Sequence, residues 1–166
     1  MLGYIYTNTY AYVEEYGLMD AKRLAGGFGW GLVATLAMSV LMIIGYATGV
    51  APMPKPIPGA LVSKVMIGVL GLGIPQAATM VLAVASHFTY GGFWGAVLAA
   101  STQRATIWKG LVLGIFLWLL MQIAVFPFLG WGFFGVAITP LISVATLILH
   151  LVYGATLGWL LDRKRK

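Results

Sequence analysis

Four long apolar stretches, with charged residues confined to their ends, constrain this chain more than any other feature. They cover about residues 26–48, 75–100, 107–128 and 140–161, and each is long enough to cross the hydrocarbon core of a bilayer as a helix. The chain is 61% hydrophobic and only 8% charged, whereas about a quarter of the residues of a soluble domain are charged. The sequence therefore predicts an all-α polytopic membrane protein with four transmembrane helices.

The placement of basic residues predicts the orientation of these helices. Eight basic residues flank one side of the predicted bundle, whereas only Lys55 and Lys64 flank the other. Because basic loops stay in the cytoplasm, we expect a protein of the cytoplasmic (inner) membrane with both termini inside. Since the basic residues gather at the ends of the spans, the net charge of +6 reflects membrane topology and does not indicate that nucleic acid is a partner. The eight residues are Lys22, Arg23, Arg104, Lys109, Arg163, Lys164, Arg165 and Lys166.

Three shorter segments accompany the four-helix bundle, which is expected to occupy residues 26–162. Residues 1–25 are rich in tyrosine and have too few charges for a solvated tail, so we expect them to lie at the membrane surface or against a partner subunit. Residues 60–73 follow a proline-rich loop and are apolar but too short to span, which predicts a short interfacial helix. Residues 163–166 form a basic tail that is expected to contact lipid headgroups.

One nine-residue pattern, His-x-x-Tyr-Gly-x-x-x-Gly, occurs twice, beginning at His87 and at His150. The copies lie in the second and fourth predicted spans, and paired glycines also open the first and third. This spacing predicts two tandem helical hairpins, related as parallel repeats by an axis along the membrane normal. Glycines four residues apart let helix backbones approach closely. The expected helix-packing residues are Gly27, Gly31, Gly91, Gly95, Gly110, Gly114, Gly154, Gly158, Tyr90 and Tyr153.

The two histidines are the candidate functional residues, because an ionisable group near the centre of a membrane is costly and usually serves a purpose. The interpretation that the sequence favours is structural: His87 and His150 would form hydrogen bonds between helices. In the alternative interpretation they are the two axial ligands of haem b, since both lie at similar depth. Gly91 and Gly154, one turn further along, would then leave room for the porphyrin.

The rest of the sequence argues against catalysis by side chains. It offers no paired carboxylates, nucleophile motif or metal-binding set, so no catalytic or metal-ligating residue is expected. No cofactor is predicted, but haem b is possible, and it is favoured over a quinone or a pigment. By elimination we expect a non-catalytic accessory or scaffold subunit of a larger membrane complex, respiratory or photosynthetic. Its partners would be membrane lipids and other membrane-protein subunits. A haem b electron-transfer protein is the alternative, and a small transporter or channel is a further one.

Several phrases resemble a family of small four-helix membrane proteins of bacteria and archaea that is known only as a domain of unknown function. They are the doubled His-x-x-Tyr-Gly, Lys109-Gly-Leu-Val-Leu-Gly114, and Pro127-Phe-Leu-Gly-Trp-Gly-Phe-Phe-Gly135. The resemblance covers about residues 24–162 and is stronger in the second half. It implies a four-helix membrane fold and implies nothing about activity.

Overall fold

The computed structural model describes residues 2–49, 56–102 and 104–163, with side chains from residue 21 onward. These ranges are helical and contain no strand, so the predicted all-α fold class is confirmed. The helices are α1 (Leu2–Ala47), α2 (Ile57–Ser63), the π-helical η1 (Lys64–Val69), α3 (Gln76–Ser101), α4 (Ile107–Leu120), the π-helical η2 (Met121–Val125), α5 (Phe126–Leu129), the 3-10 helix η3 (Phe133–Gly135) and α6 (Leu141–Arg163).

Four helical segments are long and apolar enough to cross a membrane: Ala21–Ala47, Gln76–Ser101, Ile107–Leu129 and Leu141–Arg163. Large apolar side chains remain exposed on their outer surfaces, among them Val81 and Val112. Such a surface suits lipid and not water. The chain is therefore a polytopic membrane protein, as the sequence predicts.

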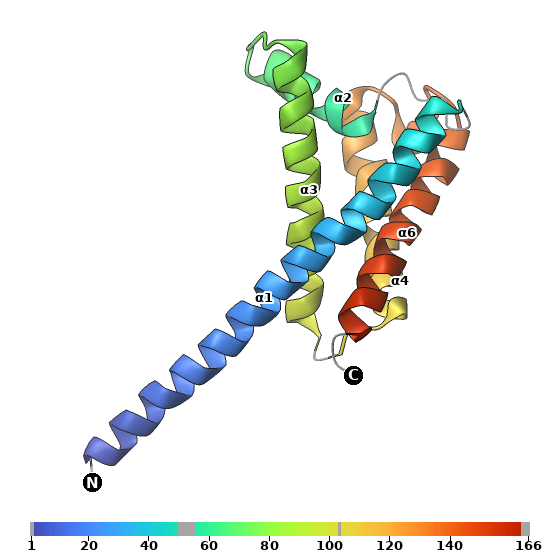
Figure 1. Ribbon diagram of the computed structural model, residues 1–166. Coiled ribbons are helices and arrows are strands. Elements are labelled where there is room, and N and C mark those ends of the chain that lie inside the picture. Colours follow the sequence, from blue (N-terminus) through green and yellow to red (C-terminus); the bar gives the residue numbers. More distant parts are fainter. Residues whose placement is uncertain (1, 50–55, 103, 164–166) are drawn as a thin grey trace.

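Helix α1 is much longer than a span requires. Its 46 residues extend about 69 Å at 1.5 Å per residue, more than twice the roughly 30 Å hydrocarbon core. No proline interrupts it, and its first half projects away from the other helices (Figure 1). The expected N-terminal segment, residues 1–25, is thus largely the beginning of this helix. Its location at the membrane surface stays a prediction.

The expected short helix at residues 60–73 begins earlier and changes geometry part-way. Helix α2 starts at Ile57, directly after Pro56, and becomes the π-helical η1 at Lys64. It packs against α3 at the end of the bundle opposite the chain's C-terminus (Figure 1). Most of the proline-rich loop before it lies outside the described residues. The chain turns back after η1 at Gly71, whose φ of +67° suits glycine.

The third span contains a π-helical turn with a clear cause. Pro127 has no N–H, and its ring would collide with the carbonyl one turn earlier in a regular α-helix. The preceding turn widens accordingly, and the Phe126 N–H bonds to the carbonyl of Met121, five residues back. Met121 and Gln122, at the start of this wider turn, are both buried.

The spans associate as two helix pairs, α1 with α3 and α4 with α6. Helix α1 also packs along α6 and so joins the pairs, whereas α3 and α4 scarcely touch. In Figure 1, α1 crosses the bundle obliquely, and the ends of α3 and α6 near α2 lie far apart.

Candidate functional site

Glycines make the contact between α1 and α3. A Cβ atom added at Gly27 would lie 2.6 Å from the Gly95 carbonyl oxygen, and one added at Gly31 would collide with the Gly91 carbonyl oxygen. Gly91 itself faces the Thr35 side chain. Gly27, Gly31 and Gly95 therefore let the two backbones meet directly, and Gly91 leaves room for the Thr35 side chain.

The contact between α4 and α6 is built in the same way. Added Cβ atoms at Gly110 and Gly154 would each collide with the carbonyl oxygen of the other residue. Gly114 faces the His150 carbonyl, and Gly158 faces the carbonyl of Thr106, 2.5 Å from an added Cβ. All eight predicted glycines thus lie at one of the two helix crossings. Both crossings lie in the half of the bundle that contains Lys22, Lys109 and Arg163, here called the basic end.

Beyond the crossings, the helices enclose a cavity of about 430 Å³ that both histidines line. We call it the histidine cavity. Its volume falls within the range of about 300–1,000 Å³ that is usual for ligand sites. The walls are mainly apolar, and no lysine or arginine lines it among the described residues. Its lining includes Thr35, Met38, Met42, Ile57, Leu61, Ser86, His87, Tyr90, Leu117, Met121, Thr146, Leu149, His150 and Tyr153.

His150 lies on α6 and is held in one orientation by its own helix. Its Nδ1 is 2.8 Å from the carbonyl oxygen of Thr146, one turn earlier, and only 8% of the residue is exposed. Because a carbonyl can only accept, Nδ1 carries the proton of the neutral ring. The Nε2 atom then has a free lone pair. Histidines that bind metals or accept hydrogen bonds from ligands are commonly oriented in this way.

His87 reaches the same cavity from α3. Its Nε2 is buried and has no hydrogen-bond partner among the described residues. Its ring makes an edge contact with Phe88, with centroids 6.1 Å apart. A buried polar atom without a partner is costly, so such an atom requires an explanation. Neither imidazole bonds to a neighbouring helix within the described part of the chain, which weakens the structural interpretation of the pair.

The two tyrosines of the repeated pattern differ in their surroundings. The Tyr153 hydroxyl donates a 2.6 Å hydrogen bond to the Gly91 carbonyl and so ties α6 to α3 next to the cavity. Tyr90 is 44% exposed, and its ring contacts that of Trp94 edge-on at 6.1 Å. The difference arises because α6 lies inside the bundle, whereas α3 stands apart from α4.

A polar cluster behind His150 fixes α6 against the third span. The Gln122 side chain is fully buried and donates from Nε2 to Thr146 Oγ1 at 3.1 Å. Trp118 Nε1 donates to the Ser143 carbonyl at 3.0 Å. The polar groups in this cluster are therefore satisfied within the protein. They hold Thr146, and with it the carbonyl that orients His150.

The cavity also contains residues that the sequence did not single out, among them Thr35 and Met42 from α1. One signal could have identified Thr35, since it follows Gly31 by one turn and lies on the same helix face. The contribution of α2, through Ile57 and Leu61, had no such signal, because it depends on how the chain folds back over the bundle.

Together these residues form an apolar cavity inside a membrane protein with two imidazoles from different helices. Such a site can hold a flat, apolar ligand and can coordinate a metal centre that this ligand carries. The lining contains no carboxylate among the described residues, so the cavity does not offer the paired carboxylates of a glycosidase or protease site.

Comparison with known proteins gives a family and no activity. No curated protein and no solved structure matches the chain. One family model, described as a family of unknown function (DUF6789), matches residues 21–166. This match begins where the membrane-spanning part of α1 begins and includes both helix pairs. The chain therefore belongs to the DUF6789 family, as the resemblance of its repeated phrases led us to expect.

Proposed function

We propose that this protein is a non-catalytic integral membrane protein that holds a flat, apolar cofactor in the histidine cavity, with His87 and His150 as its ligands. One observation carries the proposal: two imidazoles from different helices line one apolar cavity, and neither Nε2 is bound to another described residue. Haem b is the cofactor whose axial ligands this pair matches best. The role that follows is electron transfer within the membrane.

The donor set and the walls of the cavity both suit this cofactor. The bond from His150 Nδ1 to the Thr146 carbonyl supports the ring form in which Nε2 can coordinate iron. The thioether and aliphatic side chains of Met38, Met121 and Leu117 supply an apolar environment for the porphyrin. The carboxylates of the cofactor would have to reach outside the cavity, since no described cation lines it.

A haemin titration of the purified protein tests the proposal. We expect the wild type to bind haemin tightly in a 1:1 ratio, with the visible spectrum of iron bound by two imidazoles. His87→Ala and His150→Ala should each remove one axial ligand and change that spectrum. Tyr90→Phe is the matched control, because Tyr90 lines the same cavity and has no ligating nitrogen. The proposal is wrong if haemin binds equally well to all three variants, or to none of the four proteins.

An accessory role in a larger membrane complex is a second candidate, and it is compatible with the first. The feature that favours it is the first half of α1, which extends beyond the helices of the bundle (Figure 1). A helix that projects in this way offers a surface to another subunit. Purification of the full chain in mild detergent should then recover a defined partner subunit. Migration as a free monomer without partners would contradict this role.

We also propose that both termini face the cytoplasm and that the two hairpins arose by duplication. The charge distribution supports the first point, since Lys22, Arg23, Arg104, Lys109 and Arg163 lie at one end of the bundle, and Lys64 at the other. The repeated pattern and the two glycine crossings support the second. Labelling of single cysteines introduced at residues 64 and 109, from either side of intact cells, tests the orientation, because the chain has no native cysteine.

A further inference from the structure

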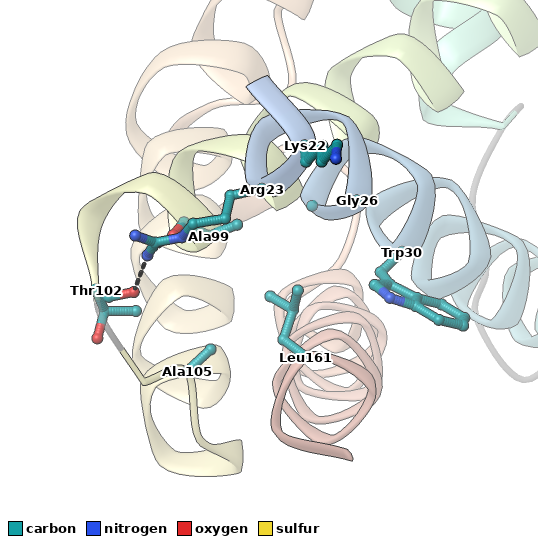
Figure 2. Close-up of a pocket in the computed structure, with 9 residues that line it drawn as sticks. Lys22, Arg23, Gly26, Trp30, Ala99, Thr102, Ala105 and Leu161 are labelled. Atoms are coloured by element: carbon teal, nitrogen blue, oxygen red, sulfur yellow. Dashed lines mark hydrogen bonds between the residues drawn. The ribbon is translucent and has the colours of Figure 1, made fainter. Parts of the chain in front are cut away.

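A second, smaller cavity of about 210 Å³ lies at the basic end of the bundle, away from the histidine cavity. It is bordered by the start of the first span, the C-terminal end of α3, the following loop and the end of α6. Figure 2 shows Lys22, Arg23, Trp30 and Leu161 arranged around this space. We call it the basic-end pocket. Small residues form the rest of its wall: Gly26, Gly27, Ala99, Thr102 and Ala105.

The two cations of this pocket have different roles. The Arg23 guanidinium donates from one nitrogen to the carbonyl oxygens of Ala99 and Thr102, both at 2.8 Å, and so caps the C-terminal end of α3 (Figure 2). Lys22 is exposed and has no hydrogen-bond or ion-pair partner among the described side chains. Its ammonium group is therefore available to an external anion.

The other described cations at this end are already engaged. Arg104 pairs with Asp162 at 3.5 Å, and the Lys109 ammonium donates to the Arg104 carbonyl oxygen at 2.7 Å. The Arg163 guanidinium lies over the Trp159 ring, 5.0 Å from its centroid. Within the described part of the chain, Lys22 thus differs from its basic neighbours in lacking a protein partner. The excess positive charge of this end is available at the basic-end pocket.

The depth and polarity of the pocket match one class of ligand. Lys22 lies at the first turn of the first span, where lipid headgroups are found. Trp30 lies eight residues further along the same helix, about 12 Å deeper into the membrane. A ligand that touched both would need an anionic group at one end and an apolar chain at the other. An anionic phospholipid has this structure, and basic pockets between transmembrane helices commonly hold such headgroups.

We propose that the basic-end pocket binds one anionic phospholipid, with its phosphate beside Lys22 and Arg23 and the start of an acyl chain against Trp30 and Leu161. The site is independent of the histidine cavity and of any cofactor. Bound lipid would fill the space that α1, the end of α3 and the end of α6 border.

Native mass spectrometry of the full-length protein in mild detergent tests this site, with added phosphatidylglycerol or phosphatidylcholine. We expect preferential retention of phosphatidylglycerol. Lys22→Gln should weaken that retention about fivefold, because one lysine near the headgroup contributes roughly this much. Leu161→Trp should weaken it too, by filling the apolar part of the pocket without a change of charge. Lys64→Gln, at the opposite end of the bundle, is the matched control and should have no effect.

Each other outcome overturns the proposal. Equal retention of both lipids would show that the pocket does not recognise negative charge. Unchanged phosphatidylglycerol binding in either pocket variant, or an equal loss in Lys64→Gln, would place the lipid elsewhere. Displacement of the lipid by inorganic phosphate at equal concentration would identify a site for free anions instead.

Discussion

The substitution Tyr153→Phe tests the packing of the histidine cavity most cleanly. It removes a single hydroxyl and leaves the ring, which is only 3% exposed, in its place. The lost interaction is the 2.6 Å hydrogen bond to the Gly91 carbonyl, which joins α6 to α3. The Gly91 carbonyl lies within an α-helix, where it also accepts the backbone hydrogen bond of the helix, so the substitution leaves no unsatisfied hydrogen-bond acceptor.

Hydrogen bonds between transmembrane helices contribute about 0.6 kcal/mol on average and up to about 1.7 kcal/mol. The short distance and deep burial of this bond place it in the upper half of that range. We therefore expect Tyr153→Phe to lower the free energy of unfolding by about 1–1.7 kcal/mol, which is roughly a five- to sixteenfold change in the unfolding equilibrium.

The assay is reversible unfolding in mixed micelles, with Tyr90→Phe as the matched control. Tyr90 occupies the same place in the other copy of the repeated pattern, but it is 44% exposed. Its hydroxyl makes no hydrogen bond between helices among the described residues, so we expect its loss to cost little. Equal destabilisation by the two substitutions would refute the reasoning, because it would mean that α3 and α6 are not joined through Tyr153.

Two further predictions concern the helix contacts, and each has its own control. Gly110→Ala should destabilise the protein by about 1–3 kcal/mol, because the new Cβ would collide with the α6 backbone. Gly29→Ala should be neutral or stabilising, since nothing lies within 4 Å of that position. Thermal unfolding in detergent measures both, and equal effects would contradict the crossing geometry. Arg23→Gln should cost about 0.3–1 kcal/mol by releasing the end of α3. Arg104→Gln should cost less, because its ion pair with Asp162 is largely exposed, and the reverse order would count against the capping role.

The sequence predicted the parts of the fold that depend on local composition. Apolar runs identify spans because a membrane requires every backbone group to be bonded within its helix. Glycines four residues apart identify faces where backbones approach, and each of the eight lies at a crossing in the structure.

The sequence could not predict which helices pack against one another, or through which of their faces. Tyr90 and Tyr153 occur in the same sequence pattern. Their different roles arise because α6 packs against both α1 and α4, whereas α3 packs against α1 and scarcely touches α4. The position of α2 over the histidine cavity also depends on how distant helices pack. The bonds from Arg23 to the end of α3 depend on it as well, because the partners of Arg23 lie more than 70 residues away in the chain.

The candidate site was predictable as a pair of residues and not as a cavity. The repeated pattern placed His87 and His150 at similar depth in two of the spans. It could not show that the His150 ring bonds to its own helix, or that His87 lacks a partner among the described residues. These two observations are the basis of the proposal that the histidines are ligands.

A visible spectrum of the reduced protein, purified from its native membrane and then exposed to carbon monoxide, tests whether the histidine cavity holds haem b. If His87 and His150 hold haem b, the preparation will show a reduced haem spectrum that carbon monoxide leaves unchanged, because both axial positions are occupied by imidazole. A colourless preparation would contradict the claim, and so would a haem spectrum that carbon monoxide shifts readily.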